Sequence, residues 1–447
     1  MSSQKGGAPL KLNHLLREND LLPFHMPGHK RNSRFGISGS EIDITEIEGF
    51  DNLHNADGIL KELEDTYSKL YSSSKSILSV NGSTCCVLSA VFALCGRGDK
   101  IIIARNCHKS VYNACLLNEL AVTYIEPEFD EKLGMYTKVS QQALDNALKA
   151  APDAKAVVIT SPTYEGVISR VSCDIPLIID AAHGAHFGFA DFLPEKMYGD
   201  IVINSLHKTL PALTQTAVIH IYNPELTEGV KKYMDIFETS SPSYVLLASA
   251  DICADFLKSP EPLYEEYKIN LDEFKTKLSL LSNIHLYDND DPTRLVVYSD
   301  NMNGVELAEL LRREYRIEPE GATLNYVILI STVCDEKEAF NSLFDALADI
   351  SKNHFGNYSF YVEKPPLPEV YCKMSEVKET EETQLENSVG KVSGEFIFAY
   401  PPGIPVIAPG EVISEELLKT ISQMKKTGVN LISDGDITAN TILTKKH

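Results

Sequence analysis

The chain has 447 residues, of which 43% are hydrophobic and 23% are charged, a composition typical of globular proteins with two or three domains. Its 41 lysines and arginines are outnumbered by 63 aspartates and glutamates, so the net charge is −22. This balance argues against a nucleic-acid partner and against anionic membrane surfaces, because both are bound by clustered positive charge.

The nine cysteines favour a reducing compartment. Their number is odd and no two have C-x-x-C spacing, so the sequence predicts neither a disulfide framework nor a zinc site. The first twenty residues lack the apolar segment of a signal peptide, and no apolar run reaches membrane-spanning length. We therefore expect a cytoplasmic protein with no membrane partner.

The first 55 residues are irregular and rich in Pro, Gly, His and Asp. They are expected to form an arm of ordered loops (residues 1–55) that contributes to an active site or a subunit interface. An amphipathic helix follows, because six apolar or aromatic residues fall on one helical face: Ile59, Leu60, Leu63, Tyr67, Leu70 and Tyr71.

Between residues 76 and 221, short apolar runs rich in β-branched residues alternate with helical stretches. The predicted strands are SILSV, KIIIA, AVTYIE, KAVVITS, PLIID, DIVINS and AVIHI. Parallel strands buried on both faces have this continuous apolar pattern, which predicts an α/β fold with a mainly parallel sheet in a large domain, residues 56–260. Ligands of such sheets bind at the carboxyl ends of the strands.

After residue 260 the pattern is mixed and predicts a smaller C-terminal α+β region, residues 261–447. DPTRLVVYSD and LNYVILISTVCD are expected to contain strands, and GVELAELLRREY and SEELLKTISQMKK to be helices. The charge-rich segment SEVKETEETQLENSVGK is expected to be an exposed helix or a linker.

Four groups of polar residues stand at the ends of predicted strands. The first is Asn81-Gly82-Ser83-Thr84, directly before a helix, where backbone N–H groups and hydroxyls favour a phosphate. The alternative is an ordinary helix cap. The second is His108, which follows IIIARN and can stack on an aromatic ring; the alternative is a loop histidine with satisfied hydrogen bonds.

The third group is in PLIIDAAHGAHFGF, where Asp180 closes an apolar strand. A carboxylate buried there needs a cationic partner, and a protonated pyridine nitrogen of a cofactor is one candidate. The alternative is that Asp180 caps the next turn. His183 and His186 could suggest a metal, but their i, i+3 spacing is interrupted by Gly184 and no further ligand completes a site, so we predict no metal.

The fourth group is Ser-Leu-His-Lys-Thr after DIVIN. Its Lys208 follows a strand end, where a lysine near apolar walls can lose its proton and form a Schiff base. A surface lysine is the alternative. Together, a phosphate loop, a stacking histidine, a strand-end aspartate and a strand-end lysine are the parts that bind pyridoxal phosphate.

These motifs resemble those of the ornithine/lysine/arginine decarboxylase family of fold-type I pyridoxal-phosphate enzymes. The resemblance covers almost the whole chain, from HMPGHK through NGST, RNCHKS, TSPTYEG, DAAHGAHF, SLHKTLPALTQ and TSSPSY to YPPGIPVIAPGE. It implies an aspartate-aminotransferase-like large domain and a smaller C-terminal domain. HMPGHK begins near the start of the chain, so the chain looks like a short form without the N-terminal wing domain.

The resemblance also implies roles for individual residues. Lys208 matches the lysine that forms the Schiff base, Asp180 the partner of the pyridine nitrogen, and His108 the stacking histidine. The cofactor site implied in this way comprises Gly82, Ser83, Thr84, His108, Asp180, Ala182, His183, Ser205, His207, Lys208, Ser240 and Ser241.

Two further roles concern the substrate and a second subunit. The TSSPSY segment resembles one that reaches a neighbouring subunit's phosphate, with Thr239 near the substrate, which implies a homodimer with shared active sites. Glu320 resembles a glutamate near the distal cationic end of the substrate; a solvated strand-edge glutamate is the alternative. The sequence departs from the family pattern at Ala181, at Cys85 and Cys86, and in the family's LDDLH loop, which here reads Asp51-Asn52-Leu53-His54.

The resemblance implies decarboxylation of arginine, lysine or ornithine to a polyamine or its precursor. Another pyridoxal-phosphate reaction, such as transamination or C–S lysis, is an alternative that an arginine binding the α-carboxylate would favour, and Arg294 is the candidate. A binding or regulatory protein without turnover is a second alternative, although the presence of Lys208 and Asp180 argues against it.

Overall fold

The computed structural model describes residues 12–18, 38–359, 361–362, 364–399, 403–426, 429–435 and 440–446. HMPGHK and the first three residues of YPPGIP lie outside these ranges. In the N-terminal part, helix α1 (Leu12–Glu18) buries Leu12 and Leu16 against helix α8 (Tyr244–Leu257).

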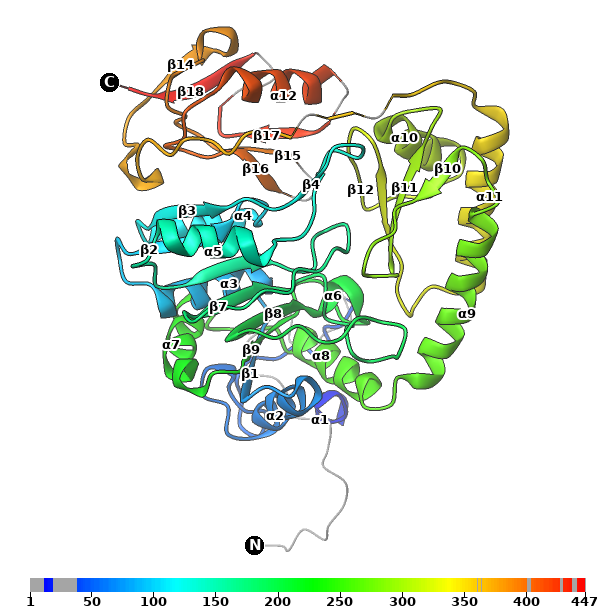
Figure 1. The fold of residues 1–447 in the computed structure, drawn as a ribbon. Helices are drawn as coiled ribbons and strands as arrows, with labels where there is room; N and C mark the ends of the chain where they lie inside the picture. Colours follow the sequence, from blue (N-terminus) through cyan, green and yellow to red (C-terminus); the bar gives the residue numbers. More distant parts are fainter. Residues whose placement is uncertain are drawn as a thin grey trace, which may run out of the picture.

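A seven-stranded sheet forms the centre of the large domain (Figure 1). Five strands, β3, β2, β6, β7 and β8, are parallel to one another, whereas β9 pairs antiparallel with both β8 and β1. The predicted α/β fold with a mainly parallel sheet is therefore confirmed. In spatial order the strands are β1 (Lys75–Ser79), β9 (Ala217–Ile221), β8 (Ile201–Ser205), β7 (Leu177–Asp180), β6 (Val157–Thr160), β2 (Lys100–Ala104) and β3 (Ala121–Ile125).

Helices cover both faces of this sheet, which is why its strands are apolar on both sides. One face packs against helices that share a core with Ile77 and Ile219, and the other against helices that share a core with Leu78 and Val218. The first group is α3 (Gly82–Leu94), α4 (Lys109–Leu117), α5 (Gln141–Ala150) and α7 (Thr227–Phe237). The second group is α1, α2 (Ile59–Tyr71) and α8.

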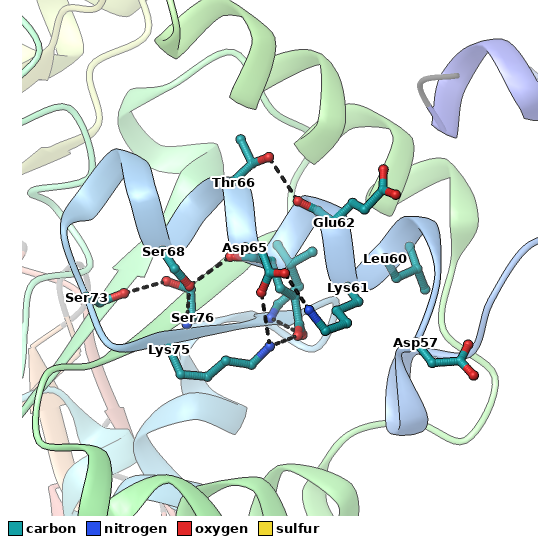
Figure 2. A network of polar contacts seen from close by, with 12 residues as sticks. Asp57, Leu60, Lys61, Glu62, Asp65, Thr66, Ser68, Ser73, Lys75 and Ser76 are labelled. Carbon is teal, nitrogen blue, oxygen red and sulfur yellow. Dashed lines mark hydrogen bonds and ion pairs between the residues drawn. The ribbon is translucent and has the colours of Figure 1, made fainter. Parts of the chain in front are cut away.

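Polar contacts attach α2 to the neighbouring strand β1 (Figure 2). The buried carboxylate of Glu64 accepts hydrogen bonds from Lys75 Nζ at 2.7 Å and from the Leu78 amide at 3.3 Å. On the next turn of α2, the Ser68 hydroxyl accepts a bond of 2.8 Å from the Ser76 amide (Figure 2). These bonds hold β1 against α2, and they thereby help to position the loop that leads from β1 into α3.

A second unit follows the large domain. Its antiparallel sheet has the order β10-β11-β13-β12 and packs against three helices around a core of its own. The strands are β10 (Ile284–Leu286), β11 (Arg294–Ser299), β13 (Val327–Ile330) and β12 (Gly321–Ala322). The helices are α9 (Glu261–Leu278), α10 (Gly304–Glu314) and α11 (Lys337–Asn353).

The C-terminal residues form a third unit, which lies next to β2 and β3 (Figure 1). It contains two small sheets and helix α12 (Glu415–Lys426) around a core that includes Ile397 and Ile442. The sheets are built from β14 (Thr380–Gln384) with β18 (Thr441–Lys445), and from β15 (Ile397–Ala399), β16 (Ile404–Ile407) and β17 (Leu431–Ser433).

The expectation of an exposed helix or linker over residues 375–391 is wrong. Five of these residues form strand β14, which pairs antiparallel with β18 over its whole length. Only Thr383 of β14 is buried, and its hydroxyl bonds that of Thr444 at 2.8 Å. An edge strand that exposes four of its five side chains has no apolar pattern to reveal it.

Candidate active site

Polar side chains from four parallel strand ends meet at one cavity. Asn106 and His108 follow β2, Thr160 ends β6, Asp180 ends β7, and Lys208 follows β8. The cavity has a volume of about 400 Å³. It is also lined by Asn81, Gly82, Ser83, Thr84, Tyr136, Thr163, Tyr164, Glu165, Ala182, His183, His207, Thr214, Gln215, Glu320 and Ile404.

Most of the residues predicted for the site are brought together here. Ten of them line the cavity: Gly82, Ser83, Thr84, His108, Asp180, Ala182, His183, His207, Lys208 and Glu320. Ser205 is fully buried beside it, and its hydroxyl donates to Ser83 Oγ at 3.0 Å.

The segment Thr239–Ser241 is not part of the cavity lining. Ser240 and Ser241 are exposed, and the Thr239 carbonyl accepts a 2.7 Å hydrogen bond from His54 Nε2. The residue before the segment, Glu238, is buried and accepts a bond from the Ser79 hydroxyl at 2.6 Å. The segment therefore lies beside the loop that precedes α3, with its serines directed to the surface of this chain.

Lys208 sits in the one-turn helix α6 (Leu206–Thr209), directly after β8. Its Nζ lies 3.0 Å from His183 Nε2. Burial lowers the pKa of Lys208, because water no longer solvates the ammonium form, while Asp180 opposes this shift and Arg294 adds to it. The surroundings of the amine thus favour its neutral form more than water does.

Asp180 is 4% exposed and faces the same cavity. Its Oδ1 accepts a hydrogen bond of 3.2 Å from the Ala182 amide. Burial raises the pKa of this carboxyl group, and the charge of Lys208 and the amide work against that rise. A carboxylate so placed can be stabilised by a second positive charge in the cavity.

The N-terminus of α3 forms another wall. Gly82 has φ of +75°, and its N–H donates to the Gln215 carbonyl at 2.8 Å, which holds the loop against the residues before β9. Gly82 suits this position because L side chains are strained at such φ values. The first-turn amides of a helix have no acceptor within the helix, so here they and the hydroxyls of Ser83 and Thr84 can bind an anion.

His108 is the N-cap of α4. Its Nδ1 accepts a hydrogen bond of 3.2 Å from the Ser110 amide, so the proton of the neutral ring is on Nε2. Burial, with the charges of Lys208 and Lys109, lowers the pKa of His108 to about 4. The ring is therefore neutral at physiological pH and lines the cavity as a flat, uncharged surface.

Two carboxylates, Glu320 and Glu165, lie in the part of the cavity contributed by the second unit and the loop after β6. Tyr164 Oη donates to Glu320 Oε1 at 2.6 Å, and Tyr326 Oη donates to Glu165 Oε1 at 2.8 Å. Burial raises the pKa of Glu165. The hydrogen bond orients the carboxylate of Glu320, an exposed residue, and its charge also favours the Lys208 ammonium.

Sequence reasoning missed several lining residues. Asn106 and Thr160 could have been found by applying the strand-end rule to KIIIA and KAVVITS as well as to PLIID and DIVINS. Tyr164 and Glu165 lie within the TSPTYEG motif, and the sequence by itself assigns them no role. Their contacts with Glu320 and Tyr326 span 156 and 161 residues, and no local pattern indicates them.

Three of the departures from the family pattern, Ala181, Cys85 and Cys86, do not line the cavity. Cys85 and Cys86 are buried in the core between α3 and the sheet, and burial raises the pKa of Cys85 to about 12. Ala181 is fully buried, and its carbonyl accepts a 2.7 Å hydrogen bond from Asn204. Their side chains therefore serve packing.

The two histidines considered for a metal have different partners. His183 contacts Lys208, whereas His186 Nε2 lies 3.2 Å from Asp291 Oδ1. In the part of the chain that the structure describes, no group of three or more His, Cys, Asp or Glu side chains is arranged to hold a metal ion. Nor is any helix among the described residues long and apolar enough to cross a membrane.

Comparison with known proteins identifies the family of this chain. The family model described as Orn/Lys/Arg decarboxylase, major domain, matches residues 17–296, and the corresponding C-terminal domain matches residues 363–428. The arginine decarboxylase of Bacillus anthracis is 30% identical over 95% of this chain and 94% of its own length. The inducible lysine decarboxylase of Escherichia coli strain K12 is 22% identical over 86% of this chain and 70% of its own.

Solved structures bear out the predicted fold-type I architecture. The Francisella novicida lysine decarboxylase LdcF matches with a TM-score of 0.81 at 17% identity, over 97% of this chain and 80% of that one. Serine palmitoyltransferase of Sphingomonas wittichii matches with a TM-score of 0.55 at 15% identity, over 68% of this chain and 80% of that one. The chain belongs to the Orn/Lys/Arg decarboxylase family.

Proposed function

We propose that this chain decarboxylates a basic amino acid (arginine, lysine or ornithine) to a polyamine or its precursor, with pyridoxal phosphate bound at Lys208. The observation that carries the proposal is the convergence of Lys208, Asp180, His108 and the N-terminus of α3 on one cavity, in a member of this family. Arginine is the first substrate to test, because the relatives that are 30% identical are named arginine decarboxylases.

The residues around the cavity fit the cofactor. A phosphate needs N–H and O–H donors, which the first turn of α3 and the hydroxyls of Ser83 and Thr84 supply. A pyridine nitrogen needs an acid partner, and Asp180 is a buried carboxylate with a single amide donor among the described residues. A carbonyl group needs an amine, and Lys208 faces the same space.

When bound, pyridoxal phosphate supplies an electron sink for the pair left on Cα as the carboxylate departs as CO2. In this role, Asp180 would keep a proton on the ring nitrogen, and Ala182 and His108 would be the residues beside the ring. His108, whose Nε2 carries a proton, and Lys208 are the two groups that can return a proton to Cα. His207 donates from Nδ1 to the Thr216 carbonyl at 3.0 Å and lines the same cavity.

Glu320 is the proposed partner of the distal cation of the substrate. The hydrogen bond from Tyr164 holds its carboxylate, and its charge acts on Lys208 across the cavity. A carboxylate fixed in this way binds a guanidinium or ammonium group without paying further side-chain entropy.

Thr239, Ser240 and Ser241 are proposed to act in a homodimer with shared active sites. They lie at the surface next to the loop before α3 and outside this chain's own cavity. Such a place suits hydroxyl donors that reach a phosphate bound by a partner subunit. We also propose a cytoplasmic location, which the nine free thiols support.

The placement of Arg294 favours decarboxylation over transamination. Its side chain is 1% exposed, does not line the cavity, and donates to the His183 carbonyl at 3.2 Å. An arginine that clamps a retained α-carboxylate has to face the substrate. The presence of both Lys208 and Asp180 in the cavity likewise favours turnover over simple binding.

The decisive experiment measures CO2 release from purified protein supplied with pyridoxal phosphate and with arginine, lysine or ornithine separately. Release from one of them, abolished in Lys208→Ala, is the expected result. No release from any of them, in protein whose cofactor absorbance is present and changes on borohydride treatment, would overturn the decarboxylase proposal and leave other chemistry of the bound cofactor.

A further inference from the structure

Arg294 is among the largest fully buried side chains of the protein. It begins strand β11, and the stem of its side chain lies against Gly166, where an added Cβ would approach its Cβ and Cγ to 3.0 Å. Its Nη2 lies 3.2 Å from both the Nδ1 and the carbonyl oxygen of His183. The chain thus places a guanidinium directly behind a histidine that contacts Lys208.

The chemistry of arginine decides which ring nitrogen of His183 carries the proton. A guanidinium only donates and stays protonated, so Nδ1 of His183 has to accept. Burial, Lys208 and Arg294 lower the pKa of His183 well below its ordinary value, so the ring is neutral. A neutral ring that accepts at Nδ1 carries its single proton on Nε2.

That proton points at the amine of Lys208. Nε2 and Lys208 Nζ are 3.0 Å apart, and with the proton on Nε2 the lysine has to be the acceptor. An ammonium group has three donors and no acceptor, whereas a neutral amine has one lone pair. The Tyr164 and His183 rings pack edge to face, with their centroids 5.0 Å apart and an interplanar angle of 90°. This contact limits rotation of the His183 ring.

We propose that Arg294 is a positioning residue that acts through His183 to hold Lys208 as a neutral amine. The titratable and charged groups that act on this amine are Asp180, His183, His108, His207, Arg294 and Glu320. The carboxylates of Asp180 and Glu320 favour the ammonium form of Lys208. The N–H donor of His183 and the positive charge of Arg294 favour its neutral form.

The inference deepens the proposed function and rests on it for its purpose, because a neutral amine is the form that condenses with a carbonyl group. Its test does not depend on turnover. The full chain without added cofactor is treated with acetic anhydride across a range of pH, since only a neutral amine is acetylated. Mass spectrometry of peptides then gives the midpoint pH for Lys208, with the exposed Lys149 as an internal reference.

We call the effect of Arg294 on Lys208 through His183 the relay. Two substitutions at Arg294 separate this relay from direct charge repulsion between Arg294 and Lys208. Arg294→Met removes both the donor and the charge, whereas Arg294→Gln removes the charge but keeps an amide donor for Nδ1. The relay predicts that Arg294→Met raises the midpoint pH of Lys208 acetylation by about one unit, which is roughly a tenfold loss of reactivity at a pH below the midpoint. Arg294→Gln is expected to keep most of the native midpoint. Equal shifts in both variants would overturn the relay.

A second variant covers the case in which Arg294→Met fails to fold. His183→Phe removes the donor to Lys208 while Arg294 stays in place, so it is expected to raise the Lys208 midpoint as Arg294→Met does. An unshifted midpoint in His183→Phe would contradict the proposal. In the unaltered protein with 15N-labelled histidine, long-range nitrogen–proton spectra are expected to show His183 protonated on Nε2, and protonation on Nδ1 would refute it.

The acetylation experiment tests the relay and the CO2 measurement tests the proposed reaction, so either proposal can be rejected without the other. A low midpoint for Lys208 without CO2 release would keep the relay and reject the proposed reaction. CO2 release with an unshifted midpoint in every variant would keep the reaction and reject the relay. Surface Arg312→Met, which removes an ion pair with Glu318, is the matched control and is expected to leave the Lys208 midpoint unchanged.

Discussion

Arg105 and Glu411 form a buried bidentate ion pair although 306 residues separate them in the chain. Arg105 Nη1 and Nη2 lie 2.6 and 3.2 Å from the two carboxylate oxygens, and Tyr124 Oη donates to the same carboxylate at 2.6 Å. Arg105 directly follows β2 and precedes the loop that carries His108. The pair therefore connects the C-terminal unit to a wall of the active site.

Breaking this pair from one side is expected to be costly. Arg105→Met leaves the Glu411 carboxylate buried without its cation and should lower the free energy of unfolding by about 3–5 kcal/mol in urea denaturation. The double variant Arg105→Met/Glu411→Leu should recover much of that loss, because neither charge then remains buried. Arg97→Met, which breaks the exposed pair with Glu119, is the control and should leave stability essentially unchanged. Equal losses in the single and double variants would contradict this account.

The role proposed for Asp180 predicts a loss of rate with little change in fold. Asp180→Asn keeps the shape of the side chain but removes its charge, and kcat for CO2 release should fall about 100-fold or more, as when a preorganised electrostatic group is lost. Asp174→Asn, an exposed aspartate shortly before β7, is the matched control. Retention of full kcat in Asp180→Asn would remove Asp180 from the proposed chemistry.

Glu320 is expected to govern substrate affinity. Glu320→Gln replaces a charged acceptor by a neutral one, so KM for the basic amino acid should rise about 10–100-fold, corresponding to about 1.5–3 kcal/mol for a hydrogen bond to a charged group. Glu318→Gln lies two residues away and only removes an exposed bond to Arg312. If both variants raise KM equally, the recognition role belongs to the segment and not to Glu320.

The free energy of unfolding should fall in mild acid because of another buried histidine, His220 on β9. Its ring stacks on Tyr71 at 4.2 Å, its Nδ1 is 2.8 Å from Ser76 Oγ, and burial lowers its pKa from 6.5 to about 3. Between those values the unfolded chain binds a proton that the native chain does not, so the free energy of unfolding decreases as pH falls from 6.5 to 3.

His220→Phe removes this titration and keeps a ring beside Tyr71. Denaturation curves at pH 7, 6, 5 and 4 should show a smaller acid loss in the variant, by up to about 3 kcal/mol at pH 4. Parallel pH profiles of the variant and the unaltered protein would show that other groups cause the acid loss.

The sequence predicts those features of the fold and the site that depend on local patterns, and it does not predict those that depend on contacts between segments far apart in the chain. Helix α2 and the strands of the large sheet agree with prediction, since buried strands such as β2 and β7 are continuous apolar runs. Strand ends then locate Asp180 and Lys208, because parallel strands present their carboxyl ends at one edge.

The remainder depends on contacts between distant segments. Tyr164 gains its role only through Glu320, and Arg294 faces His183 only because the second unit packs on the large domain. The exposed strand β14 shows that charge and polarity do not exclude a strand when one buried threonine and the backbone supply the pairing.

The position of β9 has a consequence for the order of folding during synthesis. Lys75 of β1 pairs with Ile221 of β9, so the first strand of the sheet obtains its neighbour only after 146 further residues have been made. At about 5–20 residues per second, the ribosome needs roughly 7–30 s to supply them. Until then β1 has no partner strand, and the Gly82 amide has no Gln215 carbonyl to hold it. The turn before α3, which is proposed to bind the phosphate, is therefore encoded early and completed late.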